Sequence, residues 1–529
     1  MSRKLLYLVL AWLAPLLLGI ILFAGLYGQA QVHAQGIIYV DDDACPAVGT
    51  GTQVDPFCRI QDGVDTAVAN DEIHVASGTY TGVQEIVGGY GYTYTQVVFV
   101  GKNLTLYGGY DANNWDASPD PATNVTTIDA QRQGRPLSIV GTSSNILAVT
   151  VEGFTLTGGD YTGLGNPPGT SAHGCAGTGI DCGGGMLAHY ATLTLRHMII
   201  FDNVASRSDS GRLSQGGGMY LWELRGDSLV EYTTVLSNSV GRDGGSYGGG
   251  ILIQYGVGLT LRHSVIEDNA AFDSGSAGGG LYIFQPRGPV IIEDCDILGN
   301  KAYEAGGLDV NLTYVGEGLQ MNRVTLIGNE TTSRGAAIRV DKQGGGDTSA
   351  RLTNLLLAEN KTLSVADYLG IIDVGGGSSG RMDVMLAHVT AVNNQAATFL
   401  HVESYDEPAT AVLTNTLVTS FTNAFVGSEL NGVGIVAITH TNTLTENVAL
   451  LHTIRNGMPK FTAVNPLTGD PKLDGDYRLQ AGSAAIDAGV DAGVTTDIDG
   501  EKRPDGAGFD IGADEFAIYE VYLPSIFTR

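Results

Sequence analysis

Basic residues and proline are both scarce in this chain. Its 28 Lys and Arg residues stand against 56 Asp and Glu residues, which gives a formal net charge of −28. A surface with that balance repels phosphate backbones, so we expect no nucleic-acid partner. Only 16 prolines accompany 75 glycines, and no G-X-Y period exists, which excludes collagen and argues against disorder. A glycine-rich chain that is still 43% hydrophobic is typical of an all-β protein with many tight turns.

Long apolar runs are absent beyond the N-terminus. Arg3 and Lys4 precede the apolar run 5–27, and a short polar stretch ends in the small residue Ala34. This order is typical of a signal peptide that is cut after Ala34, while the length of the run also allows an uncleaved signal anchor. In either case we expect the rest of the chain to lie outside the cell membrane. We therefore expect an extracellular or cell-surface protein that meets a membrane only through this segment, if at all.

Cysteine is also scarce, and its placement suits an oxidising compartment. Cys45 and Cys58 flank one loop rich in small residues, and Cys175 and Cys182 flank another, so we expect two local disulfides. Cys295 is left over within a strand-like run, where a lone Cys is most often a small buried hydrophobe. None of the spacings resembles a zinc site.

Small-residue blocks that each open an apolar strand recur along the chain. The blocks begin at Gly183, Gly216, Gly248, Gly278, Gly306, Gly335 and Gly370. A second apolar run follows each block and ends in an Asn. These are Asn203, Asn238, Asn269, Asn300, Asn329, Asn360 and Asn393. Successive Asn residues lie between 29 and 35 positions apart, so the repeat has a period close to thirty.

One unit, residues 248–269, shows what the repeat folds into. Its short β-branched and apolar runs are bounded by Gly, Asp and Asn, and helical spacing is missing from the region. The sequence therefore predicts an all-β protein, a single right-handed parallel β-helix with three strands per turn, which we expect to be a monomer. Each Asn is expected to adopt the αL conformation of a tight turn and to hydrogen-bond the Asn of the next coil.

The N-terminal side contains one amphipathic helical stretch, residues 55–68. Its apolar residues Ile60, Val64, Ala67 and Val68 fall on one face. Because a solenoid must cover its open first coil, we expect this helix to lie across that end.

Motifs at both ends of the mature chain carry a family resemblance. The order Tyr39-Val40-Asp41, Ile73-His74-Val75 and Gly78-Thr79-Tyr80 resembles bacterial right-handed β-helix repeat proteins of the pectin-lyase-like superfamily. The segments 483–489 and 509–515 resemble the choice-of-anchor Q module of bacterial surface proteins. The expected organisation is a signal segment at 1–34, cap and first coils at 35–100, β-helix repeats at 101–470, the module at 471–516 and an apolar tail at 517–529.

Because the superfamily includes polysaccharide lyases and polygalacturonases, the resemblance raises the possibility of such an activity, but the catalytic patterns of these enzymes are missing. Lyases of this fold share an Asp cluster that holds calcium and an Arg that abstracts the proton, often in an Arg-x-Pro-x-x-Arg setting. Here Arg135-Pro136 and Arg503-Pro504 are isolated. The polygalacturonase set of Asn-Thr-Asp, Asp-Asp, Gly-His-Gly and Arg-Ile-Lys is also absent. These departures argue against an enzyme of those classes.

Carboxylates on adjacent coils are the candidates if a catalytic site exists. They are Glu267, Asp268, Glu293, Asp294 and Asp296, about one period apart. Stacked carboxylates would suit glycoside hydrolysis or a calcium ion. The alternative is that they are solvated carboxylates that prevent other strands from pairing with an exposed edge of the sheet. His197 and His263 recur at equivalent places in different repeats, which indicates that they come from duplication of the repeat and not from a shared function.

A second acidic group crowds the C-terminal module. Its members are Asp497, Asp499, Asp510, Asp514 and Glu515. Hard oxygen ligands at alternating spacing can bind calcium, although no EF-hand pattern is completed, and the sequence establishes no cofactor. The alternative is a structural role in the module's turns, with an ion pair to Arg503.

These features favour an exported, non-enzymatic β-helix that presents a long face to extracellular polysaccharide or another cell-surface component, as an adhesin does. The aromatics that could stack on sugars are Tyr220, Trp222, Tyr247, Tyr255, Tyr282 and Phe284. A polysaccharide lyase or glycoside hydrolase is the alternative function. A scaffold without a small ligand is the third, and it would lack a groove lined by converging polar groups.

Overall fold

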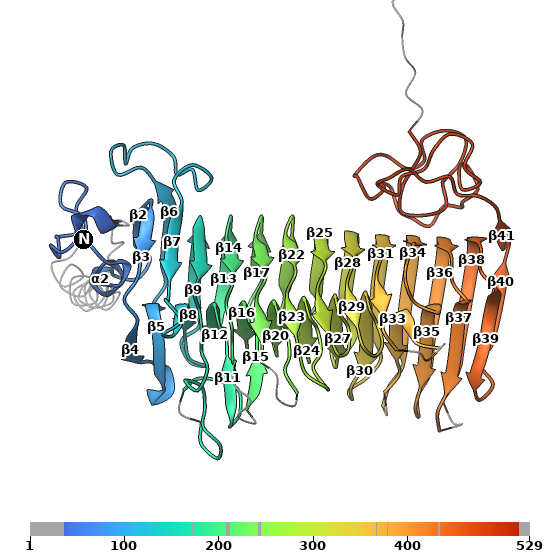
Figure 1. The fold of residues 1–529 in the computed structure, drawn as a ribbon, viewed down its shortest axis with the longest axis horizontal. Helices are drawn as coiled ribbons and strands as arrows, with labels where there is room; N and C mark the ends of the chain where they lie inside the picture. Colours follow the sequence, from blue (N-terminus) through green and yellow to red (C-terminus); the bar gives the residue numbers. More distant parts are fainter. Residues whose placement is uncertain are drawn as a thin grey trace, which may run out of the picture. The chain divides into compact units, whose positions relative to one another are not determined.

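The computed structural model describes residues 36–171, 173–207, 212–241, 245–364, 366, 368–377, 379–431 and 434–517. From residue 37 the chain winds into a right-handed parallel β-solenoid of about 13 turns, which confirms the predicted fold class (Figure 1). The predicted signal segment and residues 518–529 of the predicted tail lie outside the described residues. No helix within the described ranges is long and apolar enough to cross a membrane.

Most strands stack into three sheets, in which every pairing is parallel except the antiparallel pair of β4 with β5. The large sheet has 21 strands: β1 (Ile37–Val40), β2 (Glu72–Ala76), β3 (Gly78–Tyr80), β6 (Leu104–Tyr110), β7 (Thr126–Asp129), β9 (Leu147–Glu152), β10 (Phe154–Thr157), β13 (Ala191–Arg196), β14 (Ile199–Phe201), β17 (Ser228–Glu231), β18 (Thr234–Leu236), β21 (Leu259–Arg262), β22 (Val265–Glu267), β25 (Val290–Leu298), β28 (Gly316–Ile327), β31 (Thr348–Ala358), β34 (Met382–Val392), β36 (Ala409–Thr419), β38 (Val436–Glu446), β40 (Lys460–Val464) and β41 (Leu467–Thr468).

The middle sheet has 13 strands: β4 (Gln84–Val87), β5 (Thr93–Val100), β8 (Arg135–Val140), β12 (Met186–His189), β16 (Met219–Trp222), β20 (Ile251–Gln254), β24 (Leu281–Phe284), β27 (Leu308–Leu312), β30 (Ile338–Lys342), β33 (Gly370–Gly375), β35 (Thr398–Ser404), β37 (Asn423–Glu429) and β39 (Leu450–Asn456). The small sheet holds β19 (Ser239–Val240), β23 (Ala270–Ala271), β26 (Lys301–Ala302), β29 (Glu330–Thr331) and β32 (Lys361–Thr362), and β11 (Ile180–Cys182) pairs with β15 (Leu213–Gln215).

The core follows from the alternation of side chains along each strand. In β25, Val290, Ile292, Cys295 and Ile297 point inward and are at most 2% exposed. Because parallel strands pair in register, each inward position stacks on an inward position of the next coil, and one core runs through the solenoid. Burial of one Val, Ile or Leu side chain contributes roughly 1.5–3 kcal/mol.

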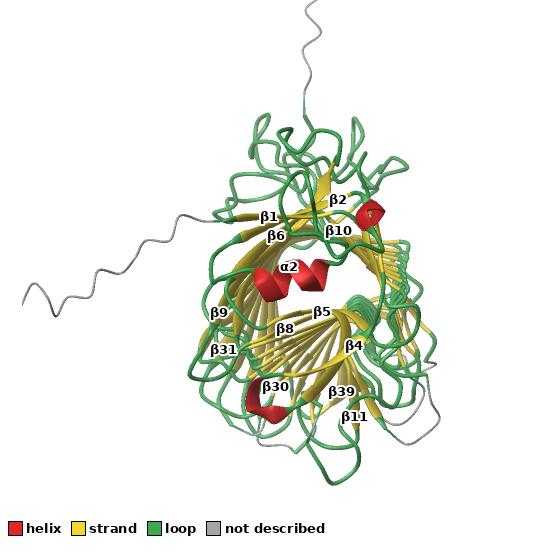
Figure 2. Cartoon of the chain, turned by 90° about the vertical axis from the view of Figure 1, so that its left-hand side faces the viewer, coloured by secondary structure: helices red, strands yellow, loops and turns green. Residues whose placement is uncertain are grey.

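The N-terminal end of this core is closed by a short helix. The helix α2 (Ile60–Thr66) lies across the first coil, as Figure 2 shows from that end. Ile60, Val64 and Ala67 are buried against the core, as predicted. Val68 was expected on the same face but is 48% exposed, because the helix ends at Thr66 and the chain turns away.

A continuous ladder of Asn side chains runs along one corner of the solenoid. From Asn238 onward, each side-chain carbonyl accepts the backbone N–H and the side-chain amide of the Asn one coil earlier, at 2.9–3.1 Å. The members are Asn203, Asn238, Asn269, Asn300, Asn329, Asn360 and Asn394. Six of the seven predicted positions are therefore in the ladder, and the amides that would otherwise be buried without partners satisfy one another.

Asn393 was predicted in the ladder and is not part of it. It belongs to a row of residues with left-handed backbone, φ 52–68°, that lies one position before the ladder. We call it the corner row; it consists of Asp202, Ser237, Asp268, Gly299, Gly328, Glu359, Asn393, Ser420 and Asn447. The αL conformation predicted for the ladder Asn residues is therefore wrong: the residue before each of them adopts it. Asn394, and not the predicted Asn393, is the ladder residue of its coil.

A second row of residues with left-handed backbone lies where the coils of the large sheet bend, from the coil that contains Gly183 to the coil of β38. This bend row, with φ 48–55°, consists of His197, Tyr232, His263, Asp294, Arg323, Asn354, His388, Asn415 and Asn442. At its N-terminal end three rings stack in parallel, with centroids 5.1 Å apart between His197 and Tyr232 and 5.0 Å apart between Tyr232 and His263. The two recurrent His residues are thus equivalent positions of one row.

Glycine blocks allow the coils to approach closely. Gly248 has φ 67°, a backbone conformation that disfavours a side chain. A Cβ on Gly249 would lie 2.4 Å from the carbonyl oxygen of Gly279 in the next coil. Larger residues at these positions would separate the stacked strands.

The segment after β41 forms a small module of turns that packs on the bend row (Figure 1). The side-chain amides of Asn354, Asn415 and Asn442 donate to the carbonyls of Thr496, Val490 and Ala488 at 2.7–2.9 Å. The later part of the bend row therefore serves as the module's docking surface.

Both predicted disulfides are present. Cys45 is joined to Cys58 and Cys175 to Cys182. Cys295 is a buried free thiol.

Candidate functional site

The outer face of the middle sheet carries two rows of side chains that stack in register from coil to coil. One row contains Leu187, Tyr220, Leu252, Tyr282, Asp309, Arg339, Asp373 and His401. The other contains His189, Trp222, Gln254, Phe284, Asn311, Asp341, Gly375 and Glu403. Apart from Gln254, both rows are aromatic or apolar up to β24, and polar and charged residues dominate from β27 onward.

A third row forms a wall beside this face. Gln215, Tyr247, Ala277 and Glu304 pair in parallel, one coil apart, and Arg334 follows. Each lies directly before a glycine block, except that Ala305 separates Glu304 from Gly306, so each of these coils supplies one wall residue and two residues of the face. The wall changes from polar and aromatic to ionic at the same coil as the face.

Aromatic residues of the face and the wall enclose a pocket of about 210 Å³. It is lined by Gln215, Tyr247, Leu252, Gln254, Tyr282, Phe284 and Gln343. The ring centroids of Tyr247 and Tyr282 are 5.0 Å apart, and those of Tyr282 and Phe284 are 6.0 Å apart, with near-parallel planes in both pairs. The other three of the six predicted sugar-stacking aromatics, Tyr220, Trp222 and Tyr255, do not line the pocket. Tyr220 is completely buried rather than exposed.

The pocket also holds polar atoms that the described residues leave without a hydrogen-bond partner. The side-chain carbonyl of Gln215 is one, on a residue that is 8% exposed. Asn311, one coil beyond Phe284, does not line the pocket, but its side-chain carbonyl also has no partner among the described residues, and its amide donates to the Tyr282 hydroxyl at 2.6 Å. A ligand that donates hydrogen bonds would satisfy such acceptors, which are costly to leave unpaired.

The ionic part of the face begins beside the pocket. Arg339 donates to Glu304 at 2.7 Å and to Asp309 at 3.1 Å, and it also contacts Asp341. Burial, which disfavours the charged form, raises the pKa of Asp309 to about 7, although the Arg339 charge opposes it. Asp309 is adjacent to Tyr282 in the register, so a carboxyl with a raised pKa adjoins the pocket.

The ionic group continues to a Ser–His–Asp arrangement. His401 lies with Nδ1 3.0 Å from an Asp373 carboxylate oxygen and Nε2 3.0 Å from the Ser428 hydroxyl. Burial acts to raise the pKa of Asp373, but the neighbouring His401 and Arg334 outweigh it and hold that pKa below its usual value. All three triad-like residues are 0% exposed, so a substrate cannot reach the hydroxyl in this conformation. We read the arrangement as a buried network that fixes these coils.

The predicted catalytic carboxylates lie on the large sheet instead. The register places Glu267 beside Leu298 and Glu293 beside Arg262, so the expected stacking of Glu267 on the later carboxylates is wrong. The reason is that the coil advances by 31 residues at this point, which is more than the spacing between Glu267 and Glu293. Asp296 pairs with Val265 in the same register.

The other two of these carboxylates occupy turn positions. Asp294 is in the bend row and is paired with Arg323, at 2.5 and 2.8 Å, whose hydrogen bond lowers the pKa of Asp294. Asp268 is in the corner row. Neither lines the aromatic pocket.

The acidic group of the C-terminal module is only partly assembled. Asp497, Asp499 and Asp514 place one oxygen each within 4.8 Å of one another. Asp497 already accepts backbone N–H groups, and Asp499 binds Arg478 at 2.5 and 2.7 Å. Arg478 therefore supplies the positive charge that a calcium ion would supply.

The remaining two acids of the module serve Arg503 and the turns. Glu515 accepts from Arg503 at 2.6 Å in a pair that is fully buried, as the structural alternative expected. Asp510 accepts the backbone N–H groups of Asp487 and Phe516 at 2.7 Å, and burial raises the pKa of Asp510 to about 7.

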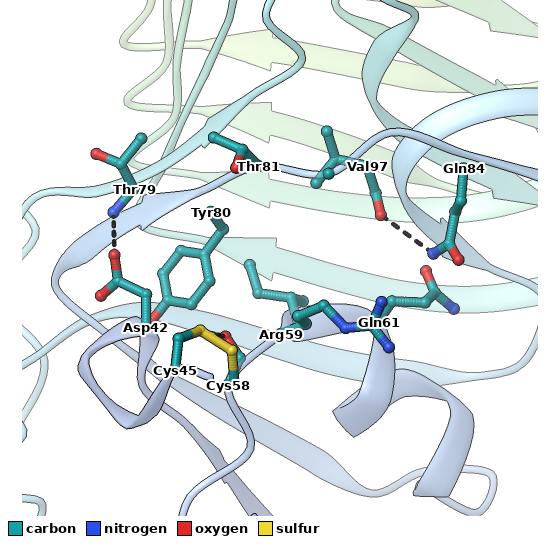
Figure 3. Close-up of a pocket in the computed structure, with 12 residues that line it drawn as sticks. Asp42, Cys45, Cys58, Arg59, Gln61, Thr79, Tyr80, Thr81, Gln84 and Val97 are labelled. Carbon is teal, nitrogen blue, oxygen red and sulfur yellow. Dashed lines mark hydrogen bonds between the residues drawn. A yellow bond between two sulfur atoms is a disulfide. The ribbon is translucent and has the colours of Figure 1, made fainter. Parts of the chain in front are cut away.

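A cavity of about 200 Å³ beneath the N-terminal cap is a weaker candidate (Figure 3). Its polar groups are already engaged: Asp42 accepts from the Thr79 N–H at 2.8 Å, and Gln61 bonds the Phe99 backbone at 2.7 and 3.3 Å. Arg59 is paired with Asp62 at 2.6 Å. Little chemistry is left for a ligand.

The ionic residues of the middle sheet were missed at the sequence level. Asp309, Arg339, Asp373 and His401 each stand singly between apolar residues of a strand, which indicates only that they face outward. Their mutual contact depends on the register of coils about thirty residues apart, which no local pattern reveals.

Comparisons with known proteins find remote structural likenesses. No protein-family model matches the chain, and no curated protein does. Among solved structures, the Agl-KA catalytic domain is similar at 14% identity and a TM-score of 0.40, covering 80% of this chain and 68% of that one. Pectate lyase Pel9A is similar at 12% identity and a TM-score of 0.35, covering 92% and 97%. The GH136 lacto-N-biosidase from Eubacterium ramulus follows at 9% identity and a TM-score of 0.30, covering 82% and 68%. Likenesses at this level carry no inference about what this chain binds or does, and the choice-of-anchor Q resemblance stays a prediction.

Proposed function

We propose that this chain is an exported, non-enzymatic protein that binds glycan at the aromatic pocket of the middle sheet. The observation that carries the proposal is the pocket lined by Tyr247, Tyr282 and Phe284, with the unpartnered carbonyl of Gln215 among them. Aromatic rings pack against the apolar faces of sugar rings, and buried acceptors match sugar hydroxyls, which donate hydrogen bonds.

The compartment fits this role. Two disulfides are stable in an oxidising space, which supports export by the N-terminal segment. The net charge of −28 disfavours a polyanionic glycan unless cations screen it, so we expect a neutral glycan.

A lyase or glycoside hydrolase is the second candidate, and one observation favours it. Asp309 adjoins the pocket, and a carboxyl whose pKa is raised to about 7 has the titration that a general acid needs. Against this, Asp309 is 0% exposed and bonded to Arg339. A binding role therefore has the stronger support.

One experiment separates the two. The purified protein is incubated with a panel of neutral and acidic polysaccharides, with and without calcium, while binding is followed by affinity electrophoresis and cleavage by reducing ends and unsaturated products. Retention on a neutral glycan without new products is expected. Cleavage that Asp309→Asn abolishes would establish the enzyme instead, and the absence of both binding and cleavage on every glycan would contradict both functions.

A further inference from the structure

Arg135, the first residue of β8, is completely buried and only partly satisfied. Its guanidinium donates from Nη2 to the Cys182 carbonyl at 2.8 Å, and its Cζ atom lies 3.6 Å from the centre of the Tyr161 ring. Within the described ranges, its Nε and Nη1 atoms have no hydrogen-bond partner. Because a guanidinium keeps its charge and can only donate, these two groups need an acceptor.

The other buried arginines of the described chain show what Arg135 lacks. Arg339 is paired with three carboxylates, and Arg503 is paired with Glu515. Arg135 is the most buried of the three at 0% exposure, yet no carboxylate among the described residues forms an ion pair with it. An unpaired charge in the interior is costly, so a counter-charge is expected beside it.

The carboxylate whose charge acts on Arg135 is that of Asp181, and other groups already occupy it. Asp181 accepts the backbone N–H groups of Gly163 and Gly165 at 3.0 and 3.1 Å, and it is paired with Arg212 at 3.0 Å. Two arginines thus share one acid, which leaves one positive charge in excess. Burial accordingly lowers the pKa of the Arg135 guanidinium, and the neighbouring groups do not offset this effect.

Two buried phenols complete a set of free donors. The hydroxyls of Tyr94 and Tyr161 have no partner among the described residues, and both side chains are 0% exposed. Burial raises the pKa of the Tyr94 phenol, and the charge of Arg135 is the largest opposing effect, so the two groups lie close together. A Cβ on Gly174 would lie 2.8 Å from the Tyr94 hydroxyl oxygen, so the chain beside the Cys175–Cys182 disulfide lies directly against this group.

We propose that Arg135, Tyr94 and Tyr161 bind a small monovalent anion of the halide class. A halide accepts hydrogen bonds from all of these donors and balances the single excess charge, whereas a water molecule only accepts the bonds. Larger anions such as acidic sugars are excluded, because all three side chains are completely buried. The ion joins β8 to the segment that the disulfide closes. This inference goes beyond glycan binding and is independent of it, since none of the three residues lines the aromatic pocket.

Hydrogen exchange of the purified protein in sodium chloride and in sodium gluconate, at equal ionic strength, tests the proposal. Gluconate is too large for an enclosed site and serves as the control anion. An ion that binds only the folded chain stabilises it by mass action. With chloride at about ten times its dissociation constant or more, amide exchange in peptides from β8 and β11 should be at least about tenfold slower than in gluconate.

Three variants separate the buried site from general salt effects. Arg135→Met removes the charge and keeps a long side chain, so it should abolish the difference between chloride and gluconate. Tyr161→Phe keeps the ring and removes one donor, so it should raise the chloride concentration needed for half of the effect by about fivefold or more. Arg351→Met is the matched control, because the Arg351 side chain is 51% exposed and paired with Glu317, and it should keep the full chloride effect.

A crystal grown in sodium bromide locates the ion directly. We expect an anomalous scattering peak within hydrogen-bond distance of Nε or Nη1 of Arg135. Only a water molecule at this position, or equal exchange rates in chloride and gluconate, would overturn the proposal. A chloride effect that persists in Arg135→Met would also overturn it, because another site would then be responsible. If Arg135→Met folds poorly, Tyr161→Phe decides, and an unchanged chloride midpoint in that variant would contradict the proposed ligands.

Discussion

The Asn ladder makes a quantitative prediction at Asn269, which is completely buried. Its side chain accepts from the backbone N–H and the amide of Asn238 at 2.9 and 3.0 Å, and donates to Val235 and Asn300 at 2.9 and 3.0 Å. Asn269→Ala removes all four bonds. At roughly 1 kcal/mol net for each bond, the local free energy of unfolding should fall by about 4 kcal/mol.

Native-state hydrogen exchange measures this loss better than a global melt, because long repeat arrays need not unfold in one step. The backbone amide of Asn238 loses its acceptor, so its protection should fall by about a thousandfold. Asn393→Gly is the control, since Asn393 lies outside the ladder with φ 54°, and we expect a change within about 0.5 kcal/mol. A fall of less than about tenfold at Asn238, or an equal effect of both variants, would refute the ladder as the main support of this corner.

Two further predictions concern the C-terminal module. Arg503→Met leaves the fully buried Glu515 carboxylate without its partner and should destabilise the module by about 3–5 kcal/mol, seen as faster proteolysis within residues 469–517 while the coils stay resistant; equal resistance of the variant would contradict this. His388 lies beneath the module, where burial, followed by the Arg503 charge, lowers its pKa to about 3. The unfolded chain binds a proton near pH 6.5 and the folded chain does not, so this contribution to stability is present above pH 6.5 and is lost as the pH falls toward 3. His388→Asn should therefore flatten the decline of Tm below pH 6.5, and an unchanged pH profile would count against the buried neutral imidazole.

The repeat could be predicted from sequence because its signals are local. Glycine blocks mark where coils approach, and an Asn after each second run marks the corner, so the period and the fold class follow directly. Sequence alone cannot decide which of residues 393 and 394 belongs to the ladder. Both are Asn, and only the three-dimensional pairing shows that Asn394 continues the ladder while Asn393 makes the turn.

The candidate site was less predictable because it is assembled from single residues of many coils. Alternation indicates that Asp309 and His401 face outward, but their complete burial and their pairing with Arg339 and Asp373 depend on register. The aromatic residues were recognised as a group. Which of them line a pocket depends on Tyr247, whose place in the wall comes from an isolated pairing outside the regular strands.

The most direct test of glycan binding is the dissociation constant for the best-bound glycan, measured by calorimetry for two matched variants. Phe284→Ala removes a ring from the pocket, whereas Phe272→Ala removes one that is 57% exposed and does not line it. Loss of a stacking aromatic should weaken binding about tenfold or more for Phe284→Ala, with no change for Phe272→Ala. Unchanged affinity in a correctly folded Phe284→Ala variant would contradict the pocket as the glycan site.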